Sequence, residues 1–143
     1  MTATQLDELR VAFKHTVNDF CEGLLSDFPD CAKLQSAWDK WDCTINQCSS
    51  ESIRVPLLDK AMRSFDQNLR EFYVRIHQKD PSVMDEITHP LFTSLDLRGK
   101  YDKYATDERD LVFAHIDSMC AIVANYVMYL ARRDGNGATT ENM

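Results

Sequence analysis

The sequence predicts an all-α protein, a single-domain bundle of about five helices packed around an apolar C-terminal helix. Residues 111–131 form a long, almost wholly apolar segment with a helix-start signal before it and a helix-stop signal after it. The segments that precede it carry apolar residues at steps of three and four, which is the period of amphipathic helices. Four glycines and four prolines in 143 residues are too few for a protein of many short strands.

The overall composition is that of an ordinary globular domain with an acidic surface. Hydrophobic residues make up 44% and charged residues 27% of the chain. The formal net charge of −7 opposes binding to phosphate backbones, so we expect no nucleic-acid partner. Residues 1–10 contain no apolar signal-peptide core, which predicts a cytoplasmic protein.

Two helices are expected in the first third of the chain. The first covers residues 4–28 and is stopped by Pro29, and the second covers residues 31–45 with Asp30 as its cap. The first apolar stripe consists of Leu6, Leu9, Phe13, Val17, Phe20, Leu24 and Phe28, and the second of Leu34, Trp38, Trp41 and Ile45.

The middle of the chain predicts one long helix and a less regular connection. After a polar loop at 46–52, a helix is expected from Pro56 to Lys79, with the proline in its first turn. A short helix follows Asp80-Pro81, and we expect Pro90 to close it. Residues 91–104 show no clear period, and the residues expected to anchor them are Leu95, Leu97, Tyr101 and Tyr104.

The last helix is expected at 106–133, which divides the chain into a bundle at 1–135 and a flexible tail at 136–143. Its length would allow it to cross a membrane. A central Asp117 costs about 2.5–3.5 kcal/mol on insertion scales, and His115, Ser118 and Asn125 also interrupt the apolar run. We therefore predict a core helix and no membrane span. The alternatives are a tail anchor and a helix whose exposed face docks on another protein.

Several polar groupings resemble catalytic or metal sites without completing one. Glu86 and His89 have the Glu-x-x-His spacing of carboxylate-bridged metal bundles, but no second pair exists. His15, Asp19 and Glu22 share a helix face without a fourth ligand. We expect no metal, no cofactor and no catalytic residues, and no small-molecule substrate is evident.

His115 and Asp117 are the notable polar residues of the apolar helix. A buried carboxylate needs a partner or a proton, and the donors expected from the third helix are Arg63, Arg70 and Arg75. This pattern favours a structural ion pair, with a buried His/Asp site as the alternative.

The five cysteines do not form a disulfide framework or a zinc motif. They are Cys21, Cys31, Cys43, Cys48 and Cys120. An odd number at irregular spacing favours free thiols, and Cys43 and Cys48 are close enough in sequence to bridge only in an oxidising compartment.

Aromatic residues supply the interface candidates, which are Trp38, Trp41, Tyr101 and Tyr104. Tryptophan and tyrosine are enriched at binding hot spots, although two tryptophans on one short helix are also typical of core packing.

Two segments resemble a pattern in small helical proteins of the nucleocytoplasmic large DNA viruses. One is residues 20–30, where a Leu-Leu pair is followed by a Phe-Pro-acid turn, and the other is residues 95–101, which precede a capped apolar helix with late tyrosines, Tyr126 and Tyr129. This resemblance implies a virion or host-contact protein without catalytic residues. The bundle is also similar to apoptosis regulators that bind partner helices in a groove, with Leu97-Arg98-Gly99-Lys100 near the place of their Asn-Trp-Gly-Arg-like turn.

The leading functional hypothesis is a non-enzymatic helical protein that acts through protein–protein contacts or self-association, as a small structural or assembly component. The alternatives are a helix-groove binding regulator, and a bundle enzyme or sensor with a buried His/Asp or metal site.

Overall fold

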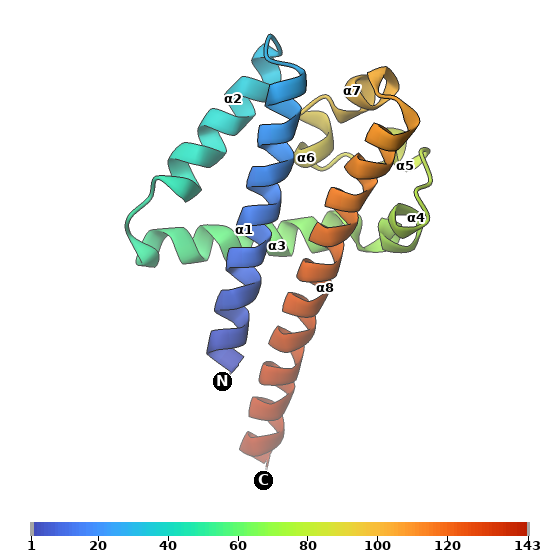
Figure 1. Ribbon diagram of the computed structural model, residues 1–143. Coiled ribbons are helices and arrows are strands. Elements are labelled where there is room, and N and C mark those ends of the chain that lie inside the picture. Colours follow the sequence, from blue (N-terminus) through green and yellow to red (C-terminus); the bar gives the residue numbers. More distant parts are fainter. Residues whose placement is uncertain (1, 143) are drawn as a thin grey trace.

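The computed structural model describes residues 2–142, and the side chains of residues 5–133. Residues 2–142 contain no strand, so the all-α prediction is confirmed. Two long helices, α1 (Thr2–Asp27) and α8 (Thr106–Asn142), lie side by side in opposite directions, and α3 (Glu51–Leu69) crosses behind both (Figure 1). α8 continues to Asn142 instead of ending at 133, so the expected flexible tail at 136–143 is helical as far as Asn142, and its side chains lie outside the described part of the chain.

Shorter elements flank this crossing on either side. α2 returns from the end of α1 to the start of α3, and a chain of short helices leads from the end of α3 to the start of α8 (Figure 1). These elements are α2 (Ala32–Trp41), a π-helical turn (Asp42–Asn46), a 3-10 turn (Arg70–Phe72), α4 (Tyr73–His77), α5 (Val83–Glu86), α6 (Pro90–Thr93) and α7 (Leu97–Lys103).

The core lies where α1 and α8 meet α3. The apolar stripe expected on the first helix faces this core, and Phe65 of α3 is 1% exposed and packs edge-on against Phe13 of α1 with ring centroids 5.8 Å apart. The inner face of α8 is completely enclosed along the contact. Its buried residues are Val112, Phe113, Ile116, Met119, Cys120, Val123 and Tyr126.

A single carboxylate joins the three long helices. Asp59 of α3 accepts hydrogen bonds from Arg10 of α1, at 2.7 Å from Nε to Oδ1, and from the hydroxyl of Tyr126 of α8. The side chains of Arg10 and Asp59 are 15% and 25% exposed, so solvent screens this ion pair less than a surface pair. The contact fixes how far α1 and α8 slide along α3.

The third helix differs from its prediction at both ends. It starts at Glu51, so Pro56 lies inside it and the expected loop at 46–52 is shorter. Proline has no backbone N–H, so one helical hydrogen bond is missing at this position. The residue whose carbonyl would have accepted that bond lies in the first turn of the helix and is exposed to solvent, so the loss is tolerated. The helix also breaks after Leu69 rather than running to Lys79. Buried Asp66, just before the break, accepts hydrogen bonds from Arg70 and Tyr73, which lie just after it.

Two predicted boundary residues have different roles. Pro90 does not close a helix but begins α6, where His89 is the N-cap and its Nδ1 accepts the Leu91 N–H at 3.1 Å. Asp30 does not cap the second helix, because the N-cap residue is Cys31. The second helix therefore starts one residue later than expected, whereas α6 is a helix that the sequence did not predict.

Phe65→Ala tests the crossing. We expect it to lower the free energy of unfolding by about 3–5 kcal/mol, because the vacated volume lies where three rigid helices cannot collapse into it. Val74→Ala is the control: Val74 is 68% exposed on α4, and its change should stay within about 0.5 kcal/mol. Denaturant unfolding followed by circular dichroism gives both values. A loss below 1 kcal/mol for Phe65→Ala would contradict this packing.

Candidate interaction face on the last helix

One face of α8 points outward along its whole described length. Eight residues at alternating steps of four and three are all exposed, and Leu111 and Met128 are exposed by 59% and 43% of their surface. We call these residues the outer face: Asp107, Leu111, Ala114, Ser118, Ala121, Asn125, Met128 and Arg132.

The outer face is unusual because it lacks charge between its ends. From Leu111 to Ala131 the one residue with a formal charge at neutral pH is Asp117, and its carboxylate contacts the His77 ring on α4 at 3.1 Å. A helix face that meets water normally carries many charged side chains. Thr106–Arg133 is also long and apolar enough to cross a membrane, and 39% of its most apolar window is buried in the bundle. One side of this helix is therefore enclosed and the other is not.

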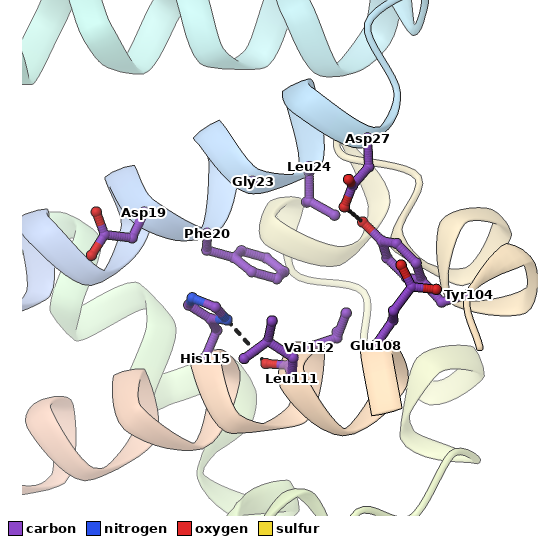
Figure 2. A pocket seen from close by; sticks show the side chains of 10 residues that line it. All are labelled: Asp19, Phe20, Gly23, Leu24, Asp27, Tyr104, Glu108, Leu111, Val112 and His115. Atoms are coloured by element: carbon purple, nitrogen blue, oxygen red, sulfur yellow. Dashed lines mark hydrogen bonds between the residues drawn. The ribbon is translucent and has the colours of Figure 1, made fainter. Parts of the chain in front are cut away.

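A groove of about 280 Å³ lies beside the N-terminal part of the outer face, between α1 and α8 (Figure 2). Its lining combines apolar side chains with polar and charged ones, and Leu111 belongs both to the groove and to the outer face. Three carboxylates, from Asp19, Asp27 and Glu108, stand around it. The lining residues are Asp19, Phe20, Gly23, Leu24, Asp27, Tyr104, Glu108, Leu111, Val112 and His115.

Hydrogen bonds hold the polar groups of the groove in place. The Tyr104 hydroxyl donates to Asp27, and His115 Nδ1 lies 2.9 Å from the Leu111 carbonyl (Figure 2). Burial, together with the Asp27 carboxylate, raises the pKa of Tyr104, so the phenol stays neutral. The groove therefore presents negative charge over an apolar floor, which suits a cationic side chain with an apolar stem.

The two ends of the outer face carry opposite charges. Asp107 and Glu108 lie in the first turn of α8, with Asp110 close by, and Arg132 lies about 37 Å farther along the helix. The Arg132 guanidinium lies 5.9 Å from the Tyr129 ring centroid and donates to the Met128 sulfur at 3.7 Å. Arg132 thus follows the outer face instead of turning toward the bundle.

The four aromatic interface candidates do not form one surface. Tyr101 is 8% exposed and packs against Phe113, so it belongs to the core. Trp41 is half-buried, donates from Nε1 to Asn18 at 2.8 Å, and lines a different cavity from Tyr104. Trp38 is also half-buried against the core. The outer face could have been found in the sequence from its heptad spacing. That spacing indicates an interface less strongly than tryptophan and tyrosine residues do.

The expected buried ion pair of α8 is replaced by a different arrangement. Asp117 is only partly buried and its partner is His77, not an arginine. Arg70 pairs with Asp66, and Arg75 pairs with Asp80 and Glu86, so neither reaches Asp117. Arg63 is exposed on α3 and, within residues 5–133, forms no ion pair with Asp117.

The other polar groupings of the sequence are also dispersed. Glu86 is bound by Arg75 and His89 caps α6, so the Glu-x-x-His pair does not converge. His15, Asp19 and Glu22 are exposed along α1. Within residues 5–133 no three His, Cys, Asp or Glu side chains lie close enough to hold a metal ion, and Cys43 and Cys48 are free thiols.

A second cavity of about 200 Å³ lies between α1, α2, α3 and α6. Its walls are mostly apolar and include Phe13, Trp41 and Phe65, together with the half-buried His89. Burial lowers the pKa of His89, and its Nδ1 already accepts the Leu91 N–H. The neutral ring therefore carries its proton on Nε2, and the cavity does not favour a charged group.

Comparison of the chain with protein-family models, with curated proteins and with solved structures finds no match. The function is therefore argued from the geometry of the chain itself.

The neutral His89 predicts a loss of stability in acid. Its pKa is below the ordinary value in the folded protein, so the unfolded chain takes up a proton first. The free energy of unfolding should therefore fall as the pH drops below about 6.5. His89→Asn keeps an N-cap acceptor but does not titrate, and it should remove this part of the fall, whereas His15→Asn at an exposed site should keep it. Denaturant unfolding at pH 7.5, 6.5 and 5.5 measures it. Parallel profiles for wild type and His89→Asn would contradict the assignment.

Proposed function

We propose that this protein acts through protein–protein contact, as a small structural or assembly component, and that the outer face of α8 is its contact surface. The observation that supports this is the uncovered, nearly uncharged side of an otherwise apolar helix. A helix that is apolar around most of its circumference needs cover on every side, and α1, α3 and α4 cover one side. The partner that fits best is a second copy of the same chain.

The spacing of the outer face is that of a helix-pairing seam. Its residues follow one another at steps of four and three, the repeat of two helices that wind around each other. Ala114, Ser118 and Ala121 occupy its centre, and side chains this small let two helix backbones approach closely. Leu111 and Met128, the two large apolar residues, lie on either side of this centre.

The seam has the symmetry that an antiparallel pair of identical helices requires. The spacing of its positions is the same in both directions from the midpoint between Met119 and Cys120. In an antiparallel pair, Leu111 of one copy therefore meets Met128 of the other, while Ala114 meets Asn125 and Ser118 meets Ala121. A two-fold axis creates each of these contacts twice.

Charge favours the same orientation. Antiparallel pairing brings Asp107 of one copy to Arg132 of the other at both ends of the seam, with Glu108 and the acidic groove close to the incoming guanidinium. Parallel pairing would instead place Asp107 against Asp107. Opposite charges across an interface mainly fix orientation and register, which is the role assigned to them here.

A virion location for this assembly is supported only by the resemblance to helical proteins of large DNA viruses, and it remains a prediction. The groove-binding regulator and the enzyme or sensor with a buried site remain alternatives, but no described group of residues favours either of them over self-association.

Ala121→Arg tests the seam directly. The exposed alanine can be replaced without disturbing the folded monomer. In the pair, the two arginines would lie close together at the centre of the seam, each against Ser118 of the other copy. We expect wild type to show the mass of a dimer by light scattering at about micromolar or higher concentration, and Ala121→Arg that of a monomer. Ser36→Arg on the exposed side of α2 is the control and should remain dimeric. A monomeric wild type that binds neutral lipid vesicles would instead support the tail anchor and overturn the proposal.

A charge exchange tests the orientation. Asp107→Arg and Arg132→Asp should each weaken the dimer about 5- to 30-fold, because each creates two like-charge contacts. The double variant, which restores opposite charges in the antiparallel register, should recover most of the affinity. Sedimentation equilibrium gives the dissociation constants. If the losses of the two single variants simply add in the double variant, the register is wrong.

A further inference from the structure

Lys100 on α7 is a buried cation without a carboxylate partner. It is 3% exposed, and no Asp or Glu of the described residues forms an ion pair with it. Its ammonium donates to the Leu95 carbonyl at 2.6 Å and to the sulfur of Cys31 at 3.1 Å, and it lies 5.5 Å from the Phe28 ring centroid. Of these neighbours, only the sulfur can acquire a full negative charge.

The position of Cys31 adds a second source of positive potential. Cys31 is the N-cap residue of the ten-residue helix α2, at the positive end of the helix dipole. The Leu34 N–H and the Lys100 ammonium lower the pKa of this thiol, against a smaller opposing effect of burial. Burying an unpaired ammonium is costly, so the cation and the thiolate stabilise each other.

We infer that Cys31 and Lys100 form a thiolate–ammonium pair, and that Cys31 is a nucleophilic modification site for small neutral electrophiles such as hydroperoxides. This site is independent of the outer face of α8, and nothing in the self-association argument depends on it.

The surroundings of the sulfur define which reactants it can meet. Cys31 is partly exposed and lines an open cavity of about 440 Å³, together with Gly99 and Lys103. Asp27, Asp30 and Asp96 also line this cavity and repel anionic reactants. A small uncharged electrophile fits the open cavity and is not repelled by these carboxylates.

The other cysteines lack this environment. Burial raises the pKa of Cys21 and of Cys120 to about 12, which keeps both as unreactive thiols. Cys43 is exposed on the π-helical turn and is a comparison site within the same chain.

The reaction with a hydroperoxide is a simple displacement. The thiolate sulfur attacks one peroxide oxygen, and the S–O bond forms as the O–O bond breaks. The leaving hydroxide, or alkoxide from an alkyl hydroperoxide, takes a proton from the buffer acid. Sulfur is oxidised to the sulfenic acid and the peroxide is reduced to water, or to an alcohol for an alkyl hydroperoxide. The product is reduced again by added thiol.

Alkylation with iodoacetamide at each cysteine, resolved by mass spectrometry of digests, tests the inference. For a cysteine in an unstructured peptide the rate falls about tenfold per pH unit below about 8.5. Cys31 should instead lose less of its rate than the peptide between pH 8.5 and 6.5, whereas Lys100→Met should return its profile toward that of the peptide. Hydrogen peroxide followed by a sulfenic-acid probe should label Cys31 before Cys43.

The wild-type protein tests the thiolate without any variant, because its Cys31 is compared with Cys43 and with the peptide. Circular dichroism shows whether Lys100→Met is folded, and Lys100→Arg, which keeps the cation, should retain the wild-type pH profile. A Cys31 rate that follows the peptide at every pH would overturn the inference. So would an unchanged pH profile in folded Lys100→Met, because the cation would then not stabilise the thiolate.

Discussion

The structure depends on the crossing of α3 with the antiparallel pair of α1 and α8. Phe65 and Met62 fill the crossing, and Asp59 receives a guanidinium from one helix and a hydroxyl from the other. The apolar contacts supply most of the stability, since burial of side chains of this size is worth about 1.5–3 kcal/mol each. The carboxylate supplies the register, because its two donors meet it only at one relative position. This crossing determines which side of α8 faces inward.

α8 is apolar around most of its circumference, and the bundle can use only half of it. The large residues, such as Phe113 and Tyr126, face the crossing, whereas the outward side carries mainly small or uncharged residues. The large residues therefore lie on one side of α8 and the small ones on the other. A helix buried on all sides would instead carry its large apolar residues around its whole circumference. α8 also differs from an ordinary surface helix, whose outer side would be charged. A second helix against the small residues satisfies both observations.

Periodicity was sufficient to predict the fold class, because stripes such as the one on α1 extend over many turns and strands are excluded by the scarcity of turn residues. It could not place contacts between residues distant in the chain. The partner of Asp117 proved to be His77, forty positions away, and Asp59 gave no sign of joining three helices. Lys100 lies in a stretch where basic and acidic residues alternate. Its burial beside Cys31 depends on how α7 packs against the start of α2, which no local pattern encodes.

Cross-linking across the α8 seam tests the central claim most directly. In a background with Cys31, Cys43 and Cys48 replaced by serine, Leu111→Cys chains are mixed with Met128→Cys chains and oxidised. An antiparallel pair brings these two positions within disulfide distance, about 7 Å or less between Cα atoms, and holds the two Leu111 positions about 25 Å apart. The account predicts the mixed Leu111–Met128 disulfide and little Leu111–Leu111 product. Predominant Leu111–Leu111 product, or no product while the free cysteines remain reactive, would contradict it.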